Sequence, residues 1–145
     1  SRVGVDAPED RSRSSQGRGL KALLDTHFLL WLVLDSPRRD EFPWLDGYRP
    51  WGVSPISFLE IQFLAEVGRL EVRQAEFMDA VSRDQRFVID EVPLVPLVEK
   101  AIKLEWTRDP FDRLLAAHSE ARRVPLCSVD RVICAEHRLM VPELS

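Results

Sequence analysis

The sequence predicts a three-layer α/β fold with a mostly parallel sheet, and two observations support this prediction. Short apolar runs alternate along the chain with longer segments whose apolar residues recur at helical spacing. The connections are short, and strands that alternate with helices form a parallel sheet covered by helices on both faces. With 145 residues, 45% of them hydrophobic, the chain is long enough for one core. We therefore expect one such domain at residues 20–145.

The first nineteen residues, SRVGVDAPEDRSRSSQGRG, have no apolar period and are rich in Ser, Gly and Arg. Such a segment cannot bury enough surface to offset its chain entropy, so we expect residues 1–19 to be a disordered tail or extension. The chain has no apolar stretch typical of a signal peptide or a membrane span. We expect a cytoplasmic protein that makes no contact with a membrane.

The first half of the chain predicts two strands, each followed by a helix. LKALLD at 20–25 is a short apolar run and is expected to be the first strand. THFLLWLVLD at 26–35 is apolar nearly all round, which is typical of a buried helix. WGVS at 51–54 predicts the second strand, and ISFLEIQFLAEV has helical spacing up to Gly68, a residue that commonly ends a helix.

The second half continues the alternation. The expected elements are a polar helix at 74–83, a strand at 87–92, a helix at 98–106 introduced by Pro93 and Pro96, a helix starting at Asp109-Pro110, a strand at 125–129, a short helix from about Asp130 and a last strand at 138–141. In parallel sheets of this kind, ligands bind beyond the carboxyl ends of the strands. Acidic residues at those ends are therefore the first candidates for a functional site.

Four acids are predicted at one end of the sheet. Asp25 ends the first strand and Asp130 ends the strand PLCSV. Glu60 lies three residues after a serine, in SFLE, which is the spacing of a capping box in the first turn of a helix. Asp112 lies three residues after Asp109, the expected N-cap of its own helix.

Each of these acids alone could be a helix cap, because a cap stabilises a helix by about 0.5–2 kcal/mol. Four acids together, with Asp109 as a fifth, would repel one another strongly if no cation were present. Their joint occurrence favours a hard metal ion, Mg²⁺ or Mn²⁺, because both prefer oxygen ligands. A metal held in this way activates a bound water for attack on a phosphodiester.

The net charge and the two cysteines say little about function. The net charge is −4, and no basic patch indicates nucleic-acid binding, although bound cations invert the charge of an acidic site. Cys127 and Cys134 lack the second pair of a zinc site and are expected to be buried thiols.

A receiver-type signalling domain would need a Lys on its last strand, and RLMVP has none. No G-x-G-x-x-G motif indicates dinucleotide binding.

Three segments together resemble the PIN-domain ribonucleases of the VapC toxin type. They are LLDTHFLLWLVLDSPR at 23–38, VSPISFLEIQFLAEVGRLEV at 53–72 and RDPFDRLLAAHSEARRVPLCSVDR at 108–131. They occur in the family's order and spacing, and the resemblance spans about residues 20–141. It implies a PIN-like nuclease domain that cleaves RNA with Mg²⁺ or Mn²⁺ and acts as the toxin of a type II toxin–antitoxin pair.

The resemblance also implies roles for individual residues. The catalytic and metal-binding acids would be Asp25, Glu60, Asp112 and Asp130, with Thr26, Asp109 and Ser128 as auxiliary residues. Arg108 and Arg113 flank the acid-rich helix start and are the candidates for contact with the RNA backbone. The alternatives left open are a PIN-fold module that only binds RNA and a housekeeping RNase that is not a toxin.

The expected partners are RNA, a small antitoxin and a second copy of the chain. The helix at 26–35 carries more apolar surface than one core-facing stripe requires, in Phe28, Leu29, Trp31, Leu32 and Val33. An antitoxin or a homodimer interface would cover this excess, and the alternative is burial within the domain's own core. Trp44, Trp51 and Trp106 are expected to pack in the core or an interface.

Overall fold

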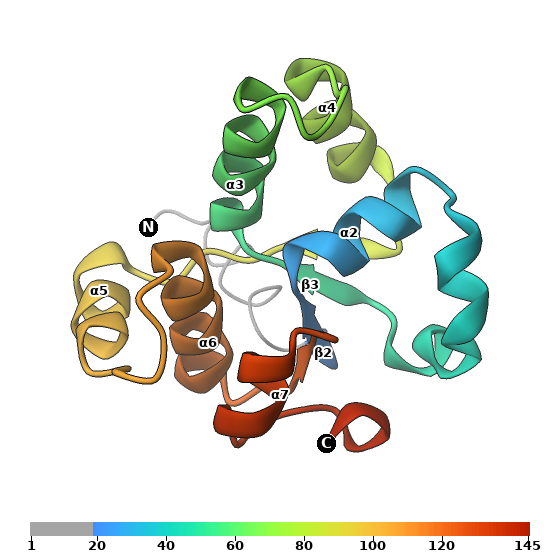
Figure 1. Ribbon diagram of the computed structural model, residues 1–145. Helices are drawn as coiled ribbons and strands as arrows, with labels where there is room; N and C mark the ends of the chain where they lie inside the picture. The colour runs from blue at the N-terminus through green and yellow to red at the C-terminus, as the bar shows by residue number, and fades with distance from the viewer. Residues whose placement is uncertain (1–18) are drawn as a thin grey trace, which may run out of the picture.

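Four parallel strands lie at the centre of the computed structural model, which describes residues 19–145 (Figure 1). They are β2 (Ala22–Leu24), β3 (Trp51–Val53), β4 (Phe87–Ile89) and β5 (Leu126–Cys127), in the order β4-β3-β2-β5 across the sheet. The three neighbouring pairs are all parallel, which confirms the predicted α/β fold. Apart from Gly19, the tail predicted at 1–19 lies outside the described residues.

Helices cover both faces of the sheet. They are α2 (Thr26–Val33), α3 (Pro55–Glu66), α4 (Gln74–Arg83), α5 (Leu94–Ile102), α6 (Pro110–Arg122) and α7 (Arg131–Glu136). Successive side chains of a strand point to opposite faces. Ala22 and Leu24 accordingly pack in the large cluster with residues of α2, α3 and α4, whereas Leu23 packs against Ile133 of α7. Figure 1 shows α5, α6 and α7 on the other side of the sheet from α2 and α4.

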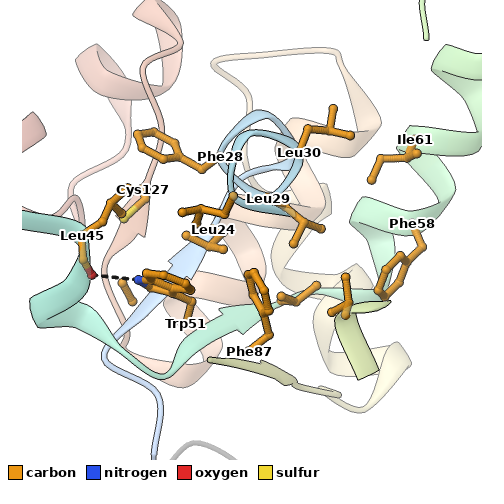
Figure 2. Packing of buried hydrophobic residues seen from close by; sticks show 14 of the residues in the cluster. Leu24, Phe28, Leu29, Leu30, Leu45, Trp51, Phe58, Ile61, Phe87 and Cys127 are labelled. Carbon is orange, nitrogen blue, oxygen red and sulfur yellow. Dashed lines mark hydrogen bonds between the residues drawn. The ribbon is translucent and has the colours of Figure 1, made fainter. Parts of the chain in front are cut away.

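The core is organised around Trp51 of β3 (Figure 2). Its indole is 1% exposed, its ring centroid lies 5.3 Å from that of Phe87, and Nε1 donates a hydrogen bond of 2.9 Å to the carbonyl of Leu45. This bond satisfies the only polar atom of the buried indole and ties the loop before β3 to the sheet. Trp44 and Trp106 are half-buried against core clusters, so the predicted packing role of all three tryptophans is confirmed.

Residues 37–48 cover the apolar surface of α2. They form two 3-10 helices, η1 (Pro37–Glu41) and η2 (Pro43–Tyr48), which no periodic pattern in the sequence predicts. Phe42 stacks on Trp31 with ring centroids 5.9 Å apart, and the guanidinium of Arg38 lies 4.3 Å from the centroid of the Trp31 ring. Phe28 is fully buried in the same cluster. The alternative of burial within the domain is therefore the correct one for α2.

The helix predicted at 98–106 and the strand predicted at 138–141 are wrong, and the other four strands are shorter than predicted. The helix predicted at 98–106 is α5, which begins at Leu94 and ends at Ile102. Pro96 lies in its first turn, where the backbone amides have no partner within the helix, so the proline interrupts nothing. The strand predicted at 138–141 is a single bridge between Met140 and Leu126, because β5 has only two residues to pair with. The strand predicted at 87–92 ends at Ile89.

None of the helices formed by residues 19–145 combines the length and the apolar content needed to cross a membrane.

Candidate functional site

The carboxyl ends of β2 and β5 bring two acids together. These strands pair in parallel, with Leu24 opposite Cys127, so the residues that follow them lie at the same edge of the sheet. Asp25 follows β2, and Asp130 follows β5 after two residues. The charge of Asp130 raises the pKa of Asp25, which shows that the two carboxylates lie within electrostatic reach of each other.

Helices α3 and α6 pack against each other and bring three more acids to the same place. Glu60 comes from α3, whereas Asp109 and Asp112 come from the start of α6. All five acids line one pocket of about 190 Å³, together with Thr26, His27, Leu64, Arg69, Leu115 and Ile133. We call this pocket the acid pocket. The structure thus brings residues 25, 60, 109, 112 and 130 to one pocket, and their catalytic and metal-binding roles stay a prediction.

Three of the acids cap helices. Asp25 accepts a hydrogen bond of 2.9 Å from the Phe28 amide at the start of α2. Asp109 accepts one of 2.8 Å from the amide of Phe111, and Asp130 accepts one of 2.9 Å from the amide of Val132. Each cap uses a single oxygen, Oδ1. Capping therefore fixes the position of these three carboxylates but uses only one oxygen of each.

Glu60 is not a capping residue, and the predicted capping box is wrong. The N-cap of α3 is Ser54, whose hydroxyl accepts from the amide of Ile56, and Pro55 is the first helical residue. Glu60 consequently lies in the second turn, where no free amide needs its carboxylate. Its side chain instead accepts a hydrogen bond from Thr26, with Oγ1 and Oε1 2.5 Å apart. Ser57 is buried, with its hydroxyl 3.1 Å from that of Thr26.

Asp112 lies in an unfavourable environment for a charged carboxylate. Burial raises its pKa most, and the charges of Asp109, Asp130, Glu60 and Asp25 raise it further, to about 7. Among residues 19–145, no hydrogen bond or ion pair compensates its side chain. An acid in this position is stabilised by a bound cation and is destabilising when ionised alone.

Burial also raises the pKa values of Asp25 and Glu60. In Asp25 the Phe28 amide and the Ser128 hydroxyl oppose this effect, and in Glu60 the Thr26 hydroxyl opposes it. Ser128 also accepts a hydrogen bond of 3.1 Å from the amide of Asp130. The two auxiliary hydroxyl residues expected from the sequence are therefore in contact with the acids.

Neither of the two arginines predicted to contact the RNA backbone lines the acid pocket, and their contact with RNA stays a prediction. Arg113 donates from Nε to the carbonyl of Thr107 at 2.7 Å, so part of its guanidinium holds the loop before α6. Arg108 is exposed and does not line the acid pocket. Arg69, which was not among the residues predicted from the sequence, does line it. Its position directly after the helix-ending Gly68 is the only local signal that could have identified it.

The acids do not form a closed ligand cage. Within residues 19–145, no group of three or more His, Cys, Asp or Glu side chains is close enough to hold a metal ion as it stands. The side chains of the acid pocket that can bind a metal ion offer carboxylate or hydroxyl oxygens, apart from the imidazole of His27. That donor set suits a hard, partly hydrated cation such as Mg²⁺, which usually keeps several waters and uses one or two carboxylates.

A separate buried network follows β4. Asp90 is fully buried, and its Oδ2 accepts hydrogen bonds from His118 Nε2 at 2.8 Å and Arg122 Nε at 2.7 Å. Arg122 also donates to the carbonyl of Glu91. Burial raises the pKa of Asp90, but the bonds from His118 and Arg122 outweigh it and hold the pKa below its ordinary value. The network ties α6, which carries Asp112, to the end of β4.

Comparisons with known proteins agree with this architecture. A family model described as "PIN domain" matches residues 22–135. No curated protein sequence is significantly similar to the chain. A chain in a structure described as a toxin–antitoxin complex from Klebsiella pneumoniae superimposes with a TM-score of 0.60 and 21% identity, over 83% of this chain and 95% of that chain. At that identity the likeness concerns the fold alone.

Proposed function

The chain belongs to the PIN domain family, and on this premise we propose that it is a metal-dependent endoribonuclease with the acid pocket as its catalytic site. The proposed catalytic and metal-binding residues are Asp25, Glu60, Asp112 and Asp130, with Thr26, Asp109 and Ser128 in auxiliary roles. The observation that carries the proposal is the environment of Asp112. Burial and the charges of four neighbouring carboxylates raise its pKa to about 7, and a bound cation would offset that cost.

The acid pocket fits Mg²⁺ or Mn²⁺ because its donors are oxygens and both ions prefer oxygen ligands. The spacing of the carboxylates suits an ion that keeps part of its water shell, since these acids do not form a closed cage. When bound, the ion would lower the pKa of a water molecule and stabilise the charge that develops on a phosphodiester.

The chain's own residues would hold the acids in place for this chemistry. Thr26 donates to Glu60 across 34 positions of sequence and fixes the carboxylate in the pocket. Asp109 caps α6 through the amides of Phe111 and Asp112, at 2.8 and 3.3 Å, and so sets where Asp112 projects. Capping bonds and the positive ends of the helix dipoles at α2 and α6 favour ionised carboxylates in the pocket.

Cleavage assays with labelled RNA test the proposal. We expect cleavage in Mg²⁺ or Mn²⁺, none in EDTA, and a strong loss in Asp25→Asn, Glu60→Gln, Asp112→Asn and Asp130→Asn with the fold preserved. Asp79→Asn is a matched control, because Asp79 is an exposed acid on α4 outside the pocket. Binding without cleavage in every divalent metal would instead support the alternative of a PIN-fold module that only binds RNA.

We further propose that the enzyme is the toxin of a toxin–antitoxin pair and acts in the cytoplasm. The support for an antitoxin is an apolar stripe on α3 beside the acid pocket. Leu59, Phe63 and Val67 recur every four residues and are 49% to 60% exposed. A partner segment with apolar side chains on this stripe could place a basic side chain among the acids, and the structural neighbour described as a toxin–antitoxin complex is in keeping with such a partner.

The proposal includes a homodimer. A second exposed apolar stripe lies on α5, in Leu94, Val95, Val98 and Ile102, and is separate from the stripe on α3. Exposed apolar surfaces of this kind are typical of interaction sites. The stripe on α3 would then bind the antitoxin, and the stripe on α5 would bind the second copy of the chain.

Crossed variants separate these two roles. We expect Phe63→Glu to lose the antitoxin and remain a dimer, and Ile102→Glu to become a monomer that still binds the antitoxin. Size-exclusion chromatography with light scattering, on the chain alone and co-produced with the product of a neighbouring antitoxin gene, measures both. A soluble monomer whose cleavage no neighbouring gene product suppresses would contradict the toxin assignment and leave the housekeeping nuclease.

A further inference from the structure

Arg69 brings a positive charge to the acid pocket. Of the Lys and Arg side chains in residues 19–145, it is the one that lines this pocket, together with the five acids and His27. Neither of the arginines selected from the sequence does so. Arg113 is bonded to the carbonyl of Thr107, and Arg108 is exposed and does not line the pocket. Arg69 is therefore the cationic group best placed to meet an anion that enters the pocket.

The backbone at Arg69 is held rigidly. Gly68 has a positive φ of 81°, a conformation that suits glycine, and ends the chain's run along α3. The amide of Gly68 donates to the carbonyl of Ala65 at 3.1 Å, and the amide of Arg69 donates to the carbonyl of Leu64 at 2.9 Å. These bonds close the end of the helix in the manner of a Schellman motif. The side chain of Arg69 therefore starts from a fixed point beside Leu64, which also lines the pocket.

Arg69 does not serve as the counter-ion of the acids. Among residues 19–145, no carboxylate oxygen lies within 4.0 Å of its guanidinium nitrogens, although other exposed arginines pair with a nearby acid, as Arg73 does with Glu76 at 3.3 Å. The largest charge effects on Asp112 come from the four other acids of the pocket. The guanidinium donors of Arg69 are thus available to a ligand.

We propose that Arg69 binds a phosphate of the RNA backbone at the mouth of the acid pocket and so holds the RNA beside the acids. This inference rests on the proposed nuclease function. A polyanion that approaches five carboxylates needs a fixed cation at the entrance, even when a metal ion neutralises part of their charge. A guanidinium suits this task because its planar donors match the oxygens of a phosphate bidentately. Arg69 would act as a positioning residue and hold no metal.

Two variants and one control test the role of Arg69. Arg69→Ala removes the donors, Arg69→Lys keeps the charge but loses the bidentate geometry, and Arg73→Ala removes an exposed arginine outside the pocket. The probe is a short fluorescein-labelled single-stranded RNA of mixed sequence. Its affinity is measured by fluorescence anisotropy in Ca²⁺ over a range of salt concentrations, and its cleavage is measured in Mn²⁺. Stabilisation by Mn²⁺ alone, followed by thermal unfolding, reports metal binding without RNA.

We expect Arg69→Ala to weaken RNA binding about tenfold and to raise KM similarly, with kcat within about twofold of wild type. The slope of log affinity against log salt should fall by about 0.7, the value for one phosphate contact on a single strand. Arg69→Lys should recover part of the affinity, and Arg73→Ala should match wild type. Stabilisation by Mn²⁺ should be the same in all four proteins.

Three results would overturn the assignment. Unchanged RNA affinity and KM in Arg69→Ala, with normal cleavage by wild type, would refute the role of Arg69 and leave the nuclease function intact. Tighter Mn²⁺ binding in Arg69→Ala would identify Arg69 as a counter-ion of the carboxylates. If wild type binds Mn²⁺ but neither binds nor cleaves the RNA, the proposed function and this inference are both overturned.

Discussion

Asp112→Asn should stabilise the metal-free protein at pH 8, and at pH 5 the gain should be only about a third as large. The pKa of Asp112 is raised from an ordinary value of 3.8 to about 7, so the folded protein binds this proton more tightly than the unfolded chain does. Stability from this group is present at low pH and is lost as the pH rises from about 4 to about 7. Asn has the same shape without the charge and removes the loss.

The raised pKa sets the size of the effect. The difference between 3.8 and about 7 corresponds to at most about 4 kcal/mol, since each tenfold change in the ionisation equilibrium is worth about 1.4 kcal/mol. Asp112 is only partly buried, and solvent screening reduces this to about 1–2 kcal/mol. For a domain of this length, that corresponds to a rise in Tm of about 4–8 °C.

The assay is thermal unfolding of wild type and Asp112→Asn in EDTA at pH 5 and pH 8. Burial lowers the pKa of His137, which therefore changes stability over the same pH range, but equally in both proteins, so its effect cancels in the difference. Asp79→Asn controls for the loss of one surface charge. Mn²⁺ at pH 8 should stabilise wild type more than the variant. A variant that is no more stable than wild type at pH 8 in EDTA would refute the unfavourable burial and repulsion of the Asp112 charge, on which the site assignment rests.

Three further predictions concern other parts of the molecule. Asp90→Asn should lower the free energy of unfolding by about 3 kcal/mol at pH 7, because it leaves Arg122 and His118 beside a neutral group. Since the pKa of Asp90 is lowered, this difference should shrink as the pH falls below about 4. Equal denaturant midpoints of wild type and variant at pH 7 would contradict this prediction. Thr26→Val should reduce cleavage at least tenfold with Tm lowered by only a few degrees, because Glu60 loses its hydrogen bond; unchanged kcat/KM would show that Thr26 does not orient it. Gly52→Ala should destabilise the protein by about 1–3 kcal/mol in chemical unfolding, because a Cβ would lie 3.1 Å from the carbonyl oxygen of Ala22. A variant as stable as wild type would show that β2 and β3 can separate slightly at no cost.

Local features of the sequence determined much of the fold. Each of the four strands is an apolar run followed by a helical period, and that alternation depends only on neighbouring residues. Asp25 and Asp130 could be selected because each follows a strand directly or nearly so, and parallel strands bring their carboxyl ends to one edge. Asp109 with Pro110 is likewise a local helix start, and it caps α6 as predicted.

Tertiary structure decided what local patterns could not. The SFLE spacing predicts a cap at Glu60, but Ser54 and Pro55 begin the helix earlier, and Glu60 bonds instead to Thr26, 34 positions away. The apolar surface of α2 is covered by residues 37–48, whose 3-10 turns have no strong periodic signal.

The pKa of Asp112 and the position of Arg69 in the acid pocket both depend on which side chains meet in space. Periods and caps follow from hydrogen bonds and packing between near neighbours in the chain, so a sequence displays them directly. Coulomb interactions and burial depend on distance after folding, and only the packing of α3 and α6 at the end of β2 brings these charges together.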